Sequence, residues 1–172
     1  MSDKKKINPE EMKRSWHSQQ EDILKDRSEQ AGCYRWMHER AYQNYNKKNM
    51  RYAIPVIIIS TVTGTANFAQ GSFPEGAKTW APLLIGTLNL AAGLITTISQ
   101  FLRVSELLEG HRAASIAYSK LSRNIAVELS LPADERTMPG IEYIKQCRGD
   151  IDRLIEQSPA VPPEILNQFN SS

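Results

Sequence analysis

The sequence predicts an all-α protein in which a two-helix transmembrane hairpin is continued by long amphipathic helices into a cytosolic helical bundle. Two observations lead to this fold class. Residues 52–74 and 79–102 contain no Asp, Glu, Lys or Arg, although charged residues make up 23% of the 172-residue chain. The segments on either side of these runs carry apolar residues at helical spacing, with charged residues between them. No segment shows the alternation that is typical of a β-strand.

Composition divides the chain into four segments. These are an N-terminal amphipathic helix at 1–52, the transmembrane hairpin at 53–102 with arms at about 53–73 and 80–102, an amphipathic helix at 103–131 that continues the second arm, and a loop, a helix and a Pro-rich tail at 132–172.

Proline and glycine mark the expected ends of the helices. Asn8 followed by Pro9 and two glutamates is typical of a helix start, so the first helix begins there. Gly32 lies inside its pattern and indicates a local break or a close helix contact. Pro132 ends the third segment, and a further helix is expected from about 141 to 157, followed by a short one after Pro163.

Both charge-free runs are long enough to span a membrane, because about 20 helical residues cross the hydrocarbon core. The second half of the first run is only weakly apolar. The segment 71–78 between the runs has turn residues, and Phe73 and Trp80 flank it as interfacial aromatics do. The alternative is that both runs are central helices of a soluble bundle. The two spanning lengths and the flanking Arg51 and Arg103 favour the membrane.

The basic residues next to the arms predict the orientation of the hairpin. Lys47, Lys48, Arg51, Arg103 and Arg112 lie on the side of the termini, whereas the turn carries only Lys78. Both termini are therefore expected on the cytoplasmic side of the membrane.

Small and polar residues predict how the arms pack. If the turn is centred between Gly76 and Ala77, equal rise per residue places positions whose numbers add to 153 at the same depth. The residues expected at the contact pair as Asn67 with Gly86, Gly64 with Asn89, and Ser60 with Gly93. Such pairs let backbones approach and offer the amide a carbonyl. The alternative is that these residues face other subunits and line a pore.

An apolar stripe follows the second arm and is expected to need a partner helix. It consists of Val104, Leu107, His111, Tyr118, Leu121 and Ile125. The equal-depth rule, extended beyond the hairpin, sets Tyr42 beside His111 and Leu24 beside Leu129, although a kink at Pro55 would shift this register.

The sequence contains no recognisable catalytic or phosphate-binding motif, so we expect no enzyme, no catalytic residue and no cofactor. His17, His38 and His111 are scattered, which favours helix surfaces or interfaces over a metal site. Cys33 and Cys147 are far apart and indicate reduced thiols. A net charge of +2 is too balanced to predict nucleic-acid binding.

The order of several short motifs resembles small two-span membrane proteins of nucleocytoplasmic large DNA viruses. The resemblance covers roughly residues 16–160 and rests on Trp16-His17, the stretches 33–38, 54–61 and 64–68, Ile85-Gly86, 101–106, Tyr118 and 153–159. The architecture also resembles the SLATT class, a pair of membrane helices with cytosolic helices after them.

Each resemblance implies a function. The first implies a structural protein, or minor capsid protein, in the inner membrane of a virus particle, whose partners are the lipid bilayer and capsid or other virion proteins. The second implies a pore-forming or membrane-perturbing effector. Both imply assembly, as a homo-oligomer or within a larger complex, and the substantial extramembrane part with its Pro-rich tail favours the structural role.

Overall fold

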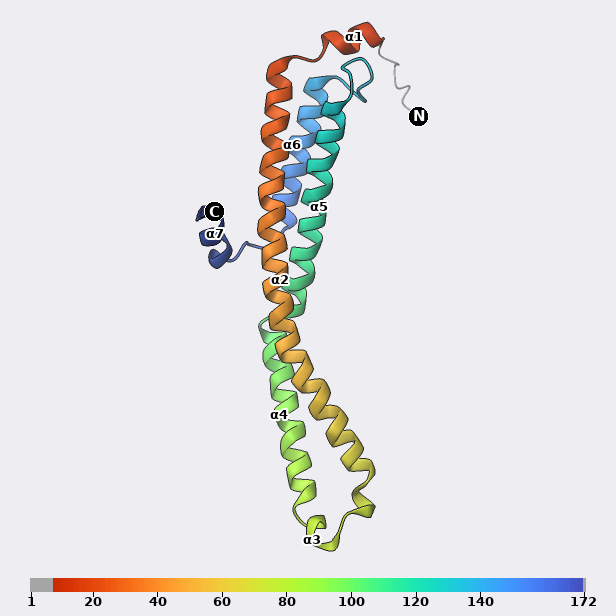
Figure 1. The fold of residues 1–172 in the computed structure, drawn as a ribbon, viewed down its shortest axis with the longest axis vertical. Coiled ribbons are helices and arrows are strands. Elements are labelled where there is room, and N and C mark those ends of the chain that lie inside the picture. Colours follow the sequence, from red (N-terminus) through yellow and green to blue (C-terminus); the bar gives the residue numbers. More distant parts are fainter. Residues whose placement is uncertain (1–7, 172) are drawn as a thin grey trace. The chain divides into compact units, whose positions relative to one another are not determined.

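The computed structural model describes residues 8–171, and within them every regular element is a helix, as predicted. The first seven residues of the predicted segment 1–52 lie outside the described part. The elements are α1 (Pro9–Arg14), α2 (Ser18–Phe68), the 3-10 helix η1 (Gln70–Ser72), α3 (Glu75–Lys78), α4 (Ala81–Phe101), α5 (Val104–Ser130), α6 (Gly140–Gln157) and α7 (Pro163–Asn170) (Figure 1).

These helices form two compact units. The bundle unit contains the described residues up to 41 and those from 110 onward, and the hairpin unit contains residues 42–109. The boundaries between the units fall inside α2 and α5, so each of these helices contributes one part to each unit.

The N-terminal helix begins where the sequence predicts and ends earlier than expected. The side chain of Asn8 accepts a hydrogen bond from the backbone N–H of Glu10, and Pro9 is the first helical residue. The helix then stops after Arg14, where the Ser15 hydroxyl donates to the carbonyl of Met12 at 2.7 Å. This break turns Trp16 into the core before α2 begins. By contrast, α2 passes through Gly32 without interruption.

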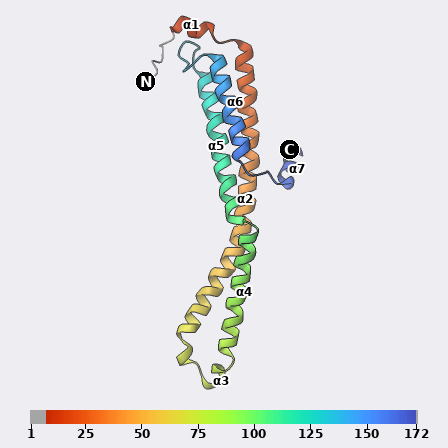
Figure 2. The ribbon, with the colours of Figure 1, turned by 180° about the vertical axis from the view of Figure 1, so that it is seen from behind.

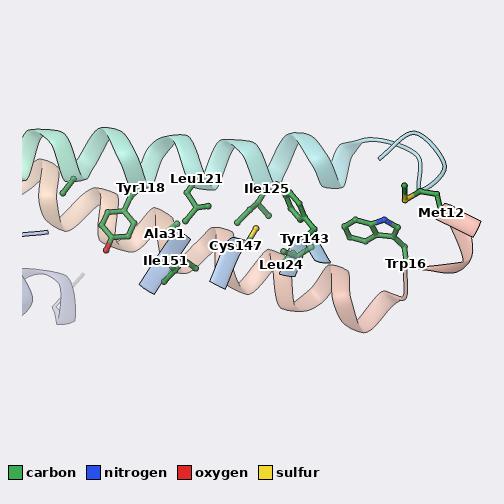
Figure 3. Close-up of a cluster of buried hydrophobic side chains, with 11 residues drawn as sticks. Met12, Trp16, Leu24, Ala31, Tyr118, Leu121, Ile125, Tyr143, Cys147 and Ile151 are labelled. Carbon is green, nitrogen blue, oxygen red and sulfur yellow. The ribbon is translucent and has the colours of Figure 1, made fainter. Parts of the chain in front are cut away.

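In the bundle unit, the first part of α2 lies beside α5 and α6 (Figures 1 and 2). Their shared core is a continuous cluster of buried side chains (Figure 3). It comprises Met12, Trp16, Leu24, Ala31, Ala114, Tyr118, Leu121, Ile125, Tyr143, Cys147 and Ile151. Each large apolar side chain buried here contributes about 1.5–3 kcal/mol to folding. The core therefore stabilises the unit by helix-on-helix packing.

The face of α6 that packs is centred on residues four apart, Tyr143, Cys147 and Ile151, all of which are buried. The predicted helix of about 141–157 is therefore correct in extent. Ile141 and Ile155 of the same helix are exposed. Further along, α7 buries Ile165 against Met37 and Ala41 of α2.

The connection between α5 and α6 is held by a buried arginine. Arg136 donates to the Glu21 carboxylate at 2.7 Å and to the carbonyl of Leu131 at 3.1 Å, and its guanidinium lies 4.3 Å from the ring centre of Trp16. Trp16 in turn donates its indole N–H to the carbonyl of Met138 at 3.1 Å. The loop is thus tied to the start of α2.

In the hairpin unit, residues 42–68 of α2 are joined to α4 through η1 and α3. The helix α2 contains Pro55 and continues on both sides of it. The expected continuous helix from the second arm to residue 131 does not form. Instead α4 ends at Phe101, and Arg103 adopts a left-handed backbone conformation with φ of 50° before α5 begins. The Arg103 side chain pairs with Glu106 in the first turn of α5.

Candidate functional site

The feature of the hairpin unit that bears on function is its apolar surface. Large apolar side chains are exposed along both arms: Ile54, Ile57, Ile58, Val62, Phe68, Leu83, Leu84, Leu90, Leu94, Ile98 and Phe101. Leu83 and Leu90 are each 75% exposed and Phe101 is 84% exposed. Exposed apolar side chains in this number are typical of a protein or membrane interface.

Among the described residues, one helix is long and apolar enough by length and composition to cross a membrane. This helix is α4, which has 21 residues and is therefore about 32 Å long. Its buried residues are only Ala81, Ile85 and Ala92. A core helix of a soluble bundle would be mostly buried, and α4 is mostly exposed.

The first arm is less apolar because it contains several hydroxyl groups, and the structure shows how these are satisfied. The hydroxyls of Thr61, Thr63 and Thr65 donate to backbone carbonyls of their own helix at 2.8–2.9 Å. The threonines of α4 behave in the same way: Thr87, Thr96 and Thr97 each donate to the carbonyl four residues earlier. Satisfied hydroxyls cost less in hydrocarbon than their number suggests.

The two arms meet along a seam that differs from the predicted contact. The seam is formed by buried or half-buried residues that include Ile59, Thr63 and Ala66 on α2 and Ile85, Leu88 and Ala92 on α4. Thr63 is 2% exposed, and its hydroxyl lies 2.7 Å from the carboxamide oxygen of Asn89. Asn49 and Ser105 meet similarly, with side-chain oxygens 3.2 Å apart. Thr63 is the direct neighbour of Gly64, the partner that the equal-depth rule assigns to Asn89.

Of the predicted packing residues, Asn89 contacts the other arm through Thr63, whereas the three glycines do not lie at the contact. Ser60, Gly64, Asn67, Gly86, Asn89 and Gly93 are all exposed. A Cβ atom built on any of the three glycines meets nothing within 4 Å. The proposed close approach of backbones at these glycines is therefore absent from this hairpin. The physical reason is rotation: each predicted residue directly follows a seam residue, and one residue turns a helix by about 100°.

The apolar stripe after the second arm finds its partner within the same chain. Tyr118, Leu121 and Ile125 belong to the bundle core together with residues of α2 and α6. Val104 and His111 are buried, and Leu107 is half-buried. Tyr118, Leu121 and Ile125 are therefore covered within the chain and are not free for assembly.

Two histidines that lie far apart in the sequence form a buried pair. Nδ1 of His38 lies 2.9 Å from Nδ1 of His111, and the side chains are 1% and 0% exposed. His38 also stacks on Tyr118, which stacks on Tyr34. Burial, reinforced by His111, lowers the pKa of His38 from 6.5 to about 4, and burial lowers the pKa of His111. Both rings are therefore neutral at pH 7, with one nitrogen donating and the other accepting.

The histidine pair shows that the predicted register of the bundle is wrong. His111 faces His38 rather than Tyr42, and Ser122 faces Ser28 with hydroxyl oxygens 3.0 Å apart. The interruption of the helix at Arg103 invalidates the assumption of equal rise on which the rule depends. Sequence reasoning missed the histidine pair because the two residues are distant in the chain and no local motif joins them.

The two cysteines are the remaining candidate groups among the described residues. Burial raises the pKa of the Cys147 thiol to about 11, which leaves it protonated and unreactive at pH 7. Cys33 and Cys147 are free thiols. Within residues 8–171, no group of three or more His, Cys, Asp or Glu side chains is placed to hold a metal ion.

The fold and the exposed apolar surface together define a helical protein with a candidate membrane helix. Comparisons of the chain with models of protein families, with curated proteins and with solved structures return no significant match.

Proposed function

We propose that the chain is a non-enzymatic structural protein that anchors a protein assembly to a membrane. The hairpin unit spans the bilayer twice, with both termini on the cytoplasmic side, and the bundle unit binds protein partners. The observation that carries this proposal is the exposure of the apolar side chains of α4, which has the length of a membrane span and is barely buried.

The first arm completes the hairpin. Ile54, Ile57, Ile58 and Val62 extend the apolar surface along α2, and the threonine hydroxyls of this arm are satisfied by their own helix. A single span would leave this arm, with its exposed apolar side chains, in water. Two spans bury both arms in lipid and return the chain to the side from which it entered.

The ends of the hairpin carry residues suited to membrane boundaries. Trp80 is 56% exposed at the start of α4, and Phe73 is half-buried in the turn. Arg51 is exposed near the opposite end of the first arm, and Arg103 near that of the second. This distribution supports the orientation with both termini in the cytoplasm.

The bundle unit has features of a binding module. Its core is closed, and exposed apolar side chains are spread over its helices, among them Ile23, Ile116, Val127, Ile141 and Leu166. The resemblance to two-span proteins of large DNA viruses suggests the assembly: a virion whose inner membrane is attached to capsid proteins. A homo-oligomer or a larger complex with capsid proteins would fit this role.

A pore-forming or membrane-perturbing effector is the second candidate. The specific observation in its favour is the exposure of Asn67 and Asn89 at membrane depth, since carboxamides can line a polar path. Against it, neither arm contains a charged residue.

Vesicle reconstitution distinguishes the candidates. The full chain is inserted into sealed phosphatidylcholine vesicles loaded with a fluorescent dye. We expect the protein to remain with the membrane after carbonate washing and the dye to leak no faster than from protein-free vesicles. Recovery in the carbonate supernatant would refute the membrane anchor, and rapid leakage would favour the pore.

A further inference from the structure

The hairpin has two different sides, and the difference is set by the seam. The residues that directly follow the seam residues are Ser60, Gly64 and Asn67 on α2 and Gly86, Asn89 and Gly93 on α4, and all are exposed. A one-residue step turns each helix by about 100°. Because the arms are antiparallel, the two turns bring these residues to the same side of the hairpin. We call this set the polar face.

The opposite side of the hairpin carries bulky apolar residues. The residues that precede seam positions include Ile58, Val62 and Leu84, which are 57%, 56% and 50% exposed. Such side chains suit contact with lipid tails. The other residues that precede seam positions are Thr65, Thr87 and Ala91, which are small, so the two sides differ in side-chain size only in part. None of the six residues that define the polar face is bulky and apolar.

The two sides of the hairpin also differ in hydrogen-bonding capacity. The Asn89 carboxamide contacts Thr63 through its oxygen, and the Asn67 oxygen accepts from the Gln70 amide at 3.1 Å. A carboxamide has two N–H donors besides its oxygen. Within the described residues, the amide nitrogens of Asn67 and Asn89 make no hydrogen bond. In hydrocarbon, donors without a partner cost free energy, whereas the threonine hydroxyls nearby are satisfied.

The polar face also has room for another helix. The open space over Gly64, Gly86 and Gly93 leaves their backbones accessible. At the end of the hairpin nearest the start of α5, a groove of about 300 Å³ is lined on this side by Ala53, Ile57, Thr96 and Gln100. A second backbone can therefore approach closely at these glycines.

We propose that the polar face binds the polar face of a second copy of this chain within the bilayer. A carboxamide both donates and accepts, so two identical faces related by a twofold axis satisfy one another. The face carries no charge that would repel its own copy or require an oppositely charged partner. This inference rests on the proposed membrane hairpin and adds the surface through which it assembles.

Disulfide crosslinking in full-length protein tests the proposal. In a Cys33→Ser, Cys147→Ala background, Gly93→Cys places a thiol on the polar face, and Ala91→Cys is the matched control at nearly the same depth on the other side. Gly64→Cys and Val62→Cys form the same comparison on α2. In vesicles, the polar-face thiols should give intermolecular dimers several-fold more efficiently than their controls. Equal crosslinking on both sides, or adducts with another protein in place of dimers, would overturn it.

Removing the carboxamides supplies a second readout. Asn67→Leu and Asn89→Leu should each weaken dimerisation by about 3- to 30-fold, as measured by energy transfer between labelled chains in micelles. Unchanged dimerisation in the double variant would contradict the proposal. Carbonate washing of the same variants in vesicles separates the failures. Membrane-bound protein without polar-face dimers refutes this interface alone, whereas soluble protein refutes the membrane anchor and the interface together.

Discussion

The histidine pair makes the stability of the bundle unit dependent on pH. Because the pKa of His38 is about 4 in the folded state and 6.5 in the unfolded state, the unfolded chain takes up the proton first as the pH falls. The stabilising effect of the neutral ring is therefore fully present above pH 6.5 and is lost towards pH 4. His111 acts in the same direction, since its pKa is also lowered.

We predict that the free energy of unfolding falls by roughly 3 kcal/mol through His38 between pH 6.5 and pH 4. Chemical unfolding followed by circular dichroism at several pH values measures this. The variant His38→Phe should lose most of this dependence, which separates the histidine from carboxylates that titrate nearby. An identical pH profile in wild type and variant would contradict the assignment.

The buried guanidinium of Arg136 is a second residue whose effect can be tested. Arg136→Met removes its bonds to Glu21 and to the loop carbonyls, which should cost about 2–3 kcal/mol of stability. The exposed pair Arg153–Asp150 is the control, and Arg153→Met should cost less than about 1 kcal/mol. Urea denaturation of the two variants compares them, and equal losses would show that Arg136 is not part of a buried network.

At the residue scale, the sequence pattern indicates which helix face is buried but not the exact direction in which each side chain points. The interior position of Tyr118 and Ile125 could be predicted because their spacing is that of one helix face. The choice between Thr63 and Gly64 as the seam residue depended on a rotation of about 100°, which periodicity of small residues does not determine. The bonds of Arg136 join parts of the chain that no local pattern connects.

At the scale of elements, a close contact between α5 and the chain after α6 depends on glycine. A Cβ atom at Gly110 would lie 2.7 Å from Cγ of Pro159, closer than real Cβ contacts. The pyrrolidine ring has little freedom to move away. Gly110 is thus required by packing, although glycine itself lowers helix propensity.

Gly110→Ala should therefore destabilise the bundle unit by about 1–2 kcal/mol, because overpacking outweighs the gain in helix propensity. Gly149 of α6 provides the matched control, since a Cβ atom there meets nothing within 4 Å. Gly149→Ala should stabilise by up to about 1 kcal/mol. Thermal unfolding of both variants measures the difference, and stabilisation by both changes would contradict the contact.

The ends of helices were predicted best where a proline or an N-cap residue marks them. Asn8 with Pro9, Pro132, and Pro163 mark ends that the structure confirms. The two interruptions that were missed, at Ser15 and at Arg103, contain neither proline nor glycine. Arg103 adopts a positive φ that arginine rarely takes, and its pairing with Glu106 supports the turn only once α5 has formed. An Arg and a Glu three residues apart also stabilise a continuous helix, so this local pair gives no signal of a break.

At the scale of the whole molecule, the two units divide the work that we propose. The bundle unit buries a conventional apolar core, whereas the hairpin unit exposes its apolar side chains. The sequence predicted this division because charge is absent from one region and present in the other. The difference between the two sides of the hairpin, on which the proposed interface rests, became visible only with the seam.

Side-specific cysteine labelling decides whether the hairpin unit crosses the bilayer twice. In the background without Cys33 and Cys147, single cysteines are placed at Gly76 in the turn, and at His17 and Ser171 near the termini. Sealed vesicles whose cytoplasmic face points outward are treated with a membrane-impermeant maleimide before and after lysis. His17→Cys and Ser171→Cys should react before lysis, and Gly76→Cys only afterwards. Labelling of Gly76→Cys in intact vesicles, at the rate seen for the other two, would contradict the two-span hairpin.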